Sequence, residues 1–296
     1  MSNIEEKLWK KIQTSINEEK ETPVKKLRFS PVLKIAVAAI LVGVIALSIY
    51  YYFPTKKESD ALAKVKVEKG LEYVKNETSV IKKVLLEDSS TVSLQPGAAI
   101  AFPKKFAADK REVFLEGVAY FKVSKNAERP FYVYDDNIIT QVLGTSFIIK
   151  KVDDKIEVDV LTGRVAVYEK NSENKQTIKQ NGVVITPNQK VIYYANNHQF
   201  VTALVENPVP VSAEDKKEAV IKFVYDDAFV SQVLNDLQNK YNIQIIVEND
   251  KINHCFFTGD ITEQSLYSKL DLLCQAIRAN YEIRGTSIII NGNGCE

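Results

Sequence analysis

The sequence predicts a single membrane-spanning helix followed by two folded parts, an all-β antiparallel domain (a sandwich or roll) and a small α/β domain with the order β-α-β-β-α-β. Three observations lead to this prediction. One uninterrupted apolar run lies at residues 32–53. Short β-like runs alternate with turn signals from residue 72 to about 205, and helical and strand-like periods alternate after residue 219.

The apolar run holds 22 residues and a single charge, Lys34. At about 1.5 Å of rise per residue, such a helix spans a hydrocarbon core of roughly 30 Å. A buried core helix of this length would normally show a polar face. A cleaved signal peptide has an apolar region of only about 7–15 residues. Both stay open as alternatives, and a permanent single span is the favoured interpretation.

Basic residues flank the run on both sides and give little orientation signal. The tail before it carries Lys20, Lys25, Lys26 and Arg28, and the segment after it carries Lys56, Lys57, Lys64 and Lys66. The positive-inside rule therefore favours a cytoplasmic N-terminus only slightly. A short tail and a long exported remainder fit the same orientation.

The tail, residues 1–31, contains a short amphipathic helix. Its apolar positions recur every four residues, with one tryptophan beside them: Ile4, Leu8, Trp9, Ile12 and Ile16. A helix of about 15 residues is marginal alone in water. It either lies on the membrane surface or docks its apolar stripe in a groove of a cytoplasmic protein. The alternative is that this helix has no specific role.

Beyond the span, composition divides the chain. Residues 54–71 are charged and predict a stalk, 72–205 the all-β domain, 206–218 a proline-bearing linker, and 219–292 the α/β domain. In the all-β domain, the expected strands are 91–94, 111–123, 131–134, 139–150, 155–160, 165–168, 183–186 and 190–194. In the α/β domain, we expect strands at 220–224, 243–247, 255–258, 281–283 and 288–290, and helices at 229–241 and 266–277.

Composition and missing motifs argue for a binding protein. The 39 basic and 38 acidic residues give a net charge of +1, which disfavours direct nucleic-acid binding. The sequence has no GxxxxGK loop, no GxSxG motif, and two histidines without zinc-site spacing. We therefore expect no enzyme, no cofactor and no metal.

All three cysteines lie in the last 42 residues, and one pair could close in an oxidising compartment. Cys255 and Cys274 are the candidate pair because both fall inside the predicted domain, whereas Cys295 is expected in a frayed end. The alternative is that Cys255 and Cys274 are buried free thiols, because sequence cannot decide connectivity.

Five segments of the β region resemble motifs of the FecR family of membrane-spanning anti-sigma regulators. In order, residues 86–94 resemble LxDGSxVxL, 111–123 REVxLxGEAYFxV, 129–131 RPF, 142–147 VLGTxF and 163–167 GxVxV. The C-terminal part is similar to a module appended to long FecR relatives, itself like the short N-terminal domain of secretins and TonB-dependent receptors. The resemblance covers roughly residues 70–290.

Three positions depart from the family pattern. Ser89 replaces the usual glycine after the aspartate, Val118 replaces the glutamate of GEAYF, and Asn188 replaces the glycine of a PGQ turn. Asparagine tolerates the left-handed conformation, so that turn can survive. The tail is also shorter than in many relatives.

The resemblance implies a signalling role in the bacterial inner membrane, with a cytoplasmic N-terminus and the bulk of the chain in the periplasm. The signalling domain of an outer-membrane TonB-dependent transporter would contact the periplasmic part, and the tail would control an extracytoplasmic-function sigma factor. The alternative is an envelope-assembly or structural binding module with no link to transcription.

The resemblance also implies a self-cleavage site at Gly144-Thr145, where some relatives cut themselves by an N-to-O acyl shift. The Thr145 hydroxyl would attack the carbonyl of Gly144, a step that needs activation or strain. The alternative is that Gly144 only shapes a bend between strands.

Overall fold

The structure, a computed structural model, describes residues 70–170, 182–211 and 222–295, and the chain from residue 59 onward forms one compact unit. The expected tail, with Ile4, Leu8, Trp9, Ile12 and Ile16, and the expected span at 32–53 lie outside the described residues. Among the helices of the described ranges, none has the length and apolar character needed to cross a membrane.

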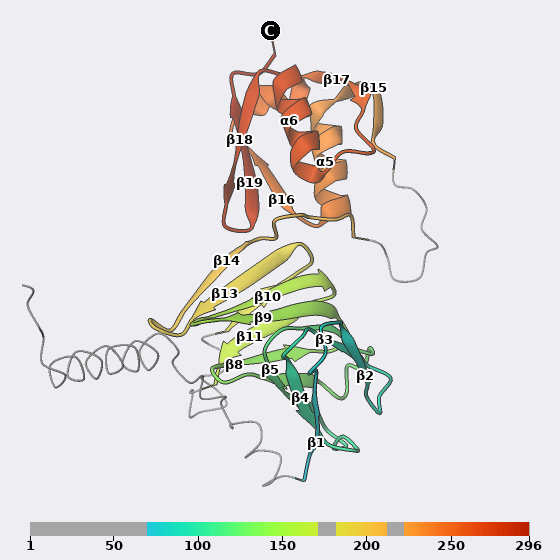
Figure 1. Ribbon diagram of the computed structural model, residues 1–296. Coiled ribbons are helices and arrows are strands. Elements are labelled where there is room, and N and C mark those ends of the chain that lie inside the picture. Colours follow the sequence, from blue (N-terminus) through green and yellow to red (C-terminus); the bar gives the residue numbers. More distant parts are fainter. Residues whose placement is uncertain (1–69, 171–181, 212–221, 296) are drawn as a thin grey trace, which may run out of the picture. The chain divides into compact units, whose positions relative to one another are not determined.

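The β region consists of two seven-stranded sheets (Figure 1). The first has the order β1 (Glu72–Lys75), β4 (Ala99–Phe102), β5 (Arg111–Glu116), β7 (Phe131–Tyr134), β8 (Ile138–Val142), β11 (Val165–Glu169), β12 (Val183–Ile185). The second has the order β14 (Gln199–Leu204), β13 (Gln189–Tyr194), β10 (Lys155–Thr162), β9 (Ser146–Val152), β6 (Ala119–Lys122), β3 (Thr91–Leu94), β2 (Lys82–Leu85). Neighbouring strands are mostly antiparallel, which confirms the predicted class, and β5 pairs with β7 in parallel.

One apolar core joins the inner faces of both sheets, so the sandwich is the architecture adopted. Alternation along β5, where every second residue is buried, directs one face inward. Phe131 of the first sheet and Phe121 and Phe147 of the second are each fully buried. The rings of Phe121 and Phe147 stack at 5.0 Å, and burying each ring stabilises the fold by roughly 1.5–3 kcal/mol.

Two long strands expected from the sequence each divide into two strands on different sheets. The expected strand 111–123 becomes β5 and β6, which meet at Gly117 with φ of 89°. The expected strand 139–150 becomes β8 and β9, which meet at Gly144. Side-chain alternation continues through such corners, so periodicity alone does not show them.

The C-terminal module has two helices and two small sheets. Its elements are β15 (Val224–Phe229), α5 (Val230–Tyr241), β16 (Gln244–Val247), the 3-10 helix η1 (Asp250–His254), β17 (Phe256–Asp260), α6 (Leu266–Ala276), β18 (Ala279–Arg284) and β19 (Ser287–Gly292). β15 pairs with β17, and a second sheet has the order β16-β19-β18 with β16 parallel to β19. α5 lies against β15, β16 and β17, α6 lies against β18, and both helices contribute to one apolar core (Figure 1).

The chain closes with the expected hairpin of two strands, β18 and β19. Counting both strands gives the order β-α-β-β-α-β-β, one strand more than the predicted order β-α-β-β-α-β. One detail of this module differs from the expectation. The first strand begins at Val224, where the expected strand 220–224 ended. It runs through a register shift between Tyr225 and Ala228, and Asp227 there has φ of 48°. This irregularity interrupts the alternation of inward-facing and outward-facing side chains, so the sequence pattern did not predict a strand over these residues.

Candidate functional site

The motif segments of the β region meet around one buried guanidinium. Arg111 is 1% exposed, and its Nη1 atom lies 2.6 Å from Oδ2 of Asp88. Its remaining donors reach backbone carbonyls: Nε donates to Arg129 at 2.8 Å and Nη1 to Ser124 at 2.9 Å. Four family motifs thus converge here, through residues 88, 111, 129 and, by a longer Nη2 contact at 3.5 Å, Leu143. This cluster organises the domain and presents no free group for chemistry.

Asp88 is itself held by a chain of hydrogen bonds. The backbone amide of Ser90 donates to Oδ1 at 3.0 Å and the Ser90 hydroxyl donates to Oδ2 at 2.7 Å. The Ser90 oxygen in turn accepts from the amide of Ser124 at 3.0 Å. Ser89 between them has φ of 67°, in the left-handed region where glycine is the residue without strain. The structure therefore explains why a glycine fits this position.

Gly144 and Thr145 lie at the corner between β8 and β9 in a tightly packed setting. A Cβ on Gly144 would lie 2.4 Å from the Cα of Lys125, and one on Gly163 would lie 2.5 Å from Cγ2 of Thr145. Thr145 is 3% exposed, and its hydroxyl has no hydrogen-bond partner among the described residues. The packing by itself requires glycine at both positions, and whether the bond is cleaved stays a prediction.

The C-terminal module carries an exposed aromatic pair on its two-stranded sheet. Phe229 ends β15 and Phe256 begins β17, and they are cross-strand partners with ring centroids 4.7 Å apart. Their residues are 47% and 54% exposed, and Val224 on the same strand is 59% exposed. We call Val224, Phe229 and Phe256 the aromatic surface. Exposed aromatic rings of this kind are enriched in protein–protein interfaces.

An open groove of about 590 Å³ adjoins the aromatic surface, between α5 and β16. It is lined by Phe229, Ser231, Gln232, Leu234, Asn235, Gln238, Ile245, Val247 and Asn253. β16 is an edge strand, and the amide of Ile245 donates to the side-chain oxygen of Gln238 at 2.9 Å. A side chain thus occupies a donor that an added strand could otherwise use.

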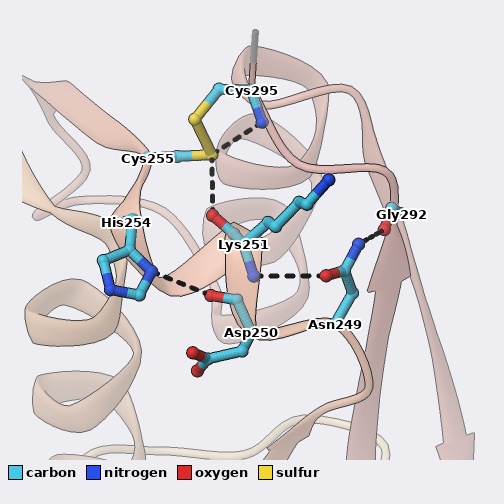
Figure 2. The surroundings of a disulfide bond; sticks show 7 residues. All are labelled: Asn249, Asp250, Lys251, His254, Cys255, Gly292 and Cys295. Atoms are coloured by element: carbon cyan, nitrogen blue, oxygen red, sulfur yellow. Dashed lines mark hydrogen bonds between the residues drawn. A yellow bond between two sulfur atoms is a disulfide. The ribbon is translucent and has the colours of Figure 1, made fainter.

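The disulfide joins Cys255 to Cys295, so the expected pair Cys255–Cys274 is wrong (Figure 2). The Cα atoms of the bonded cysteines are 5.6 Å apart, and Cys274 is a buried free thiol on α6. Parallel pairing of β19 with β16 returns residue 295 to η1, where the side chain of Asn249 donates to the carbonyl of Gly292 at 2.8 Å. Long-range pairing of this kind is invisible in cysteine spacing.

Asn188 does more than fill a turn. It has φ of 65°, as the left-handed tolerance of asparagine allows, and it is 3% exposed. Its side-chain nitrogen donates to the carbonyls of Val209 at 2.8 Å and Tyr241 at 2.6 Å, and its oxygen accepts from the amide of Val209 at 2.9 Å. A glycine could make the turn but none of these hydrogen bonds.

The aromatic surface was missed in the sequence because Phe229 and Phe256 were assigned to a helix stripe and a strand core. The signal lay in the dipeptide Phe256-Phe257 of the expected strand 255–258. Adjacent residues of a strand face opposite ways, so one of these two rings must point outward. Phe229 is the last residue of β15, directly before α5, and no comparable signal marks it. Within residues 70–170, 182–211 and 222–295, no group of three or more His, Cys, Asp or Glu side chains is placed to hold a metal ion.

A β-sandwich joined to a small α/β module, with a buried ion pair and an exposed aromatic surface, is a two-part architecture suited to binding another protein. The family model described as FecR protein matches residues 73–166, and the model described as FecR, C-terminal, matches residues 222–290. The chain belongs to the FecR family.

Two crystal structures, at 2.50 and 1.65 Å resolution, of a candidate anti-sigma factor from Parabacteroides distasonis ATCC 8503 are similar to this chain. Each is 23% identical and has a TM-score of 0.40, and the match covers 76% of this chain and 100% of that chain. No curated protein matches the sequence.

Proposed function

We propose that this protein is a single-pass transmembrane anti-sigma transducer of the bacterial inner membrane. Its tail, residues 1–31, binds an extracytoplasmic-function sigma factor. The run 32–53 crosses the membrane, and the remainder receives a signal in the periplasm from the signalling domain of a TonB-dependent outer-membrane transporter. The membership in the FecR family and the layout of tail, apolar run and folded exported part support this proposal.

The aromatic surface beside the edge strand β16 is the observation that carries the proposal. Phe229 and Phe256 are half exposed on a well-packed module, where a fold without a partner gains nothing from their exposure. The adjoining groove and the strand edge offer a place for a strand of the receptor's signalling domain. The disulfide favours an oxidising compartment for this end, which supports the periplasmic orientation that basic residues alone barely indicate.

The cytoplasmic half of the proposal is tested by co-purification. Full-length tagged protein is extracted from membranes, and the bound sigma factor is quantified. Leu8→Ala with Trp9→Ala should weaken binding by one or more decades, because each large apolar side chain contributes roughly 1.5–3 kcal/mol when buried. Lys10→Ala is the control on the polar face and should change little. Equal sigma factor on the double variant and the wild type would refute docking through Ile4, Leu8, Trp9, Ile12 and Ile16.

The periplasmic half is tested on the aromatic surface. Phe229→Ser and Phe256→Ser should weaken binding of the receptor's signalling domain at least tenfold while the module stays folded, because both residues are half exposed and lie outside the buried core. Leu272→Ser, at a residue 43% exposed on α6, is the matched control. Gln238→Ala frees the amide of Ile245 and should preserve or strengthen strand addition.

Deletion of residues 219–296 separates the two halves. The β region should stay folded, and the transcriptional response to the transporter's ligand should be lost. A deletion variant that still responds fully would place the contact in the β region. A protein that binds the signalling domain but never a sigma factor would favour the envelope-assembly alternative.

A further inference from the structure

The two sulfurs of the disulfide sit in unequal surroundings. Cys255 is 0% exposed and forms the joint between η1 and β17, whereas Cys295 is exposed. Figure 2 shows Cys295 on the end segment that follows Gly292, above Lys251 and the η1 backbone. A thiolate can therefore approach the bond from the side of Cys295, and it displaces the buried sulfur of Cys255.

Two exposed cations line a hollow beside Cys295. A hollow of about 760 Å³ is lined by Cys295, Gly294, Asn293, Ile277 and the exposed cations Lys251 and Arg278. The residues that line it include no carboxylate. Positive charge attracts an incoming thiolate to the sulfur of Cys295, and this favours exchange.

Cys255 is coupled directly to the aromatic surface. Its carbonyl accepts from the amide of Val230 at 2.8 Å, which fixes the start of α5 immediately after Phe229. The next residue along the chain is Phe256, the cross-strand partner of Phe229. The disulfide thus ties the end segment to the point from which both exposed rings project.

Hydrogen bonds between the start of η1 and β19 limit the part of the module that reduction of the disulfide would loosen. The amide of Glu248 donates to the carbonyl of Ile290 at 2.9 Å, and Asn249 donates to Gly292. These bonds keep the start of η1 on β19 without the disulfide. Reduction removes the covalent bond that holds residues 293–295. The hydrogen bond that the amide of Cys295 donates to the sulfur of Cys255, at 2.9 Å, is then lost as well. The change is therefore local to Cys255 and its neighbours.

The third cysteine stays out of the exchange. Cys274 is 4% exposed, and burial raises the pKa of its thiol to about 11. At neutral pH almost none of it is thiolate, the form that attacks disulfides. Cys274 consequently serves as an internal control for any labelling experiment.

We propose that the Cys255–Cys295 disulfide is a site of thiol–disulfide exchange, entered at Cys295, and that its reduction loosens the aromatic surface. A dithiol is the co-substrate. One of its thiolates attacks the sulfur of Cys295, the Cys255–Cys295 bond breaks, and Cys255 leaves as a thiolate and takes up a proton. The second thiol then displaces Cys295 from the mixed disulfide, so the dithiol is oxidised and the two cysteines are reduced. The effect on signalling rests on the function proposed above, whereas the exchange itself does not.

The test uses the full-length protein in lipid nanodiscs. Three reductants are compared: the neutral dithiol dithiothreitol, the anionic monothiol glutathione, and a thioredoxin-type enzyme. Without denaturant, reduction should expose Cys255 and Cys295 to alkylation and leave Cys274 unlabelled. Hydrogen exchange of amides in 224–230 and 255–260 should speed up in parallel, and Cys295→Ser should reproduce this without reductant. Cys274→Ser should behave as the wild type.

Charge provides a second readout. Lys251→Gln with Arg278→Gln should slow glutathione roughly tenfold and dithiothreitol clearly less, because glutathione carries a net negative charge in addition to that of its thiolate. If the thioredoxin-type enzyme reduces the disulfide much faster than the small thiols do, the natural reductant is a protein dithiol. If the three rates are comparable, the natural reductant is a small thiol. A bond that resists all three reductants until the module is denatured would overturn the proposal. So would reduction that leaves exchange at β15 and β17 unchanged. If reduction speeds up hydrogen exchange at β15 and β17 but leaves binding of the signalling domain unchanged, the proposed partner is refuted and the thiol–disulfide exchange is not.

Discussion

Nη1 of Arg111 and Oδ2 of Asp88 lie 2.6 Å apart, between side chains that are 1% and 8% exposed. The pair joins the first motif of the β region to the second across 23 residues of sequence. The guanidinium also lies over the ring of Phe131 at 5.4 Å. A charge this deep in the domain is tolerated because its donors are matched with acceptors.

Asp88→Asn should lower the free energy of unfolding by about 3–5 kcal/mol, because it leaves the Arg111 charge buried without its counterion. Urea unfolding of residues 59–296, followed by circular dichroism, measures the loss. Glu128→Gln, at an exposed site, is the control and should stay within about 0.5 kcal/mol. An unchanged midpoint for Asp88→Asn would show that the carbonyl acceptors alone suffice.

Ser89 and Asn188 both stand where the FecR motifs that the sequence resembles have glycine, and both have positive φ. Ser89→Gly should raise the free energy of unfolding by up to about 1 kcal/mol, because relief of left-handed strain outweighs the added freedom of the unfolded chain. Asn188→Gly should instead lower it by about 1–3 kcal/mol, because buried groups of Val209 and Tyr241 lose their partners. Thermal melts of both variants, side by side, check the opposite signs. If both substitutions change the free energy of unfolding in the same direction, backbone conformation alone would determine the effect of glycine at both positions.

Self-cleavage at Gly144-Thr145 predicts two fragments of about equal length. Thr145→Val keeps the side-chain shape and removes a buried hydroxyl without a partner among the described residues. Its free energy of unfolding should stay level or rise slightly, so loss of cleavage could not be blamed on misfolding. An immunoblot with tags at both ends compares wild type, Thr145→Val and Thr145→Ala. An intact wild type under inducing conditions would leave Thr145 as a packing residue.

Lys269 is buried inside the C-terminal module at 1% exposure. Its ammonium donates to the carbonyls of Thr262 at 2.8 Å and Gln264 at 2.6 Å, and also to that of Ile261. Lys269→Met keeps the apolar stem but leaves these carbonyls without a hydrogen-bond donor. The free energy of unfolding of the module should therefore fall by roughly 2–4 kcal/mol. Lys240→Met, on the exposed face of α5, is the matched control. Hydrogen exchange localises the effect, which should centre on residues 261–270.

Asp135 predicts a dependence of stability on pH. Burial raises the pKa of its carboxyl above the ordinary 3.8, against the attraction of Lys151. The folded chain therefore holds this proton more tightly than the unfolded chain, and protonated Asp135 contributes to the free energy of unfolding. This contribution is present in full below the ordinary pKa and is lost as pH rises through the pKa of the folded state. Asp135→Asn should then gain stability relative to wild type as pH rises from about 3 to 7. Urea midpoints across that range test the slope, with exposed Asp154→Asn as control. A constant difference between the variants would refute the assignment.

Local pattern predicted much of the fold, and long-range geometry accounts for what it missed. The turn at Leu161-Thr162-Gly163-Arg164 links β10 and β11 as expected, because glycine there takes φ of 78°. β4 was missed because all four of its residues are buried, so it shows no alternation. β14 was missed because, of its six residues, only the last, Leu204, is buried, so no buried face shows in its sequence. Of the candidate site residues, Gly144 and Thr145 are placed at a sheet corner that no period of two could reveal.

The disulfide has a consequence for the order of events in biogenesis. A chain is made from its N-terminus, so Cys255 and Cys274 both leave the ribosome before Cys295, which follows Cys255 by 40 residues. In an oxidising compartment, the mismatched pair becomes available before the native partner arrives. Packing of α6, which buries Cys274, is then what protects the nascent module. Variants that slow the folding of α6 should accumulate a scrambled isomer, and their yield should depend on a disulfide isomerase.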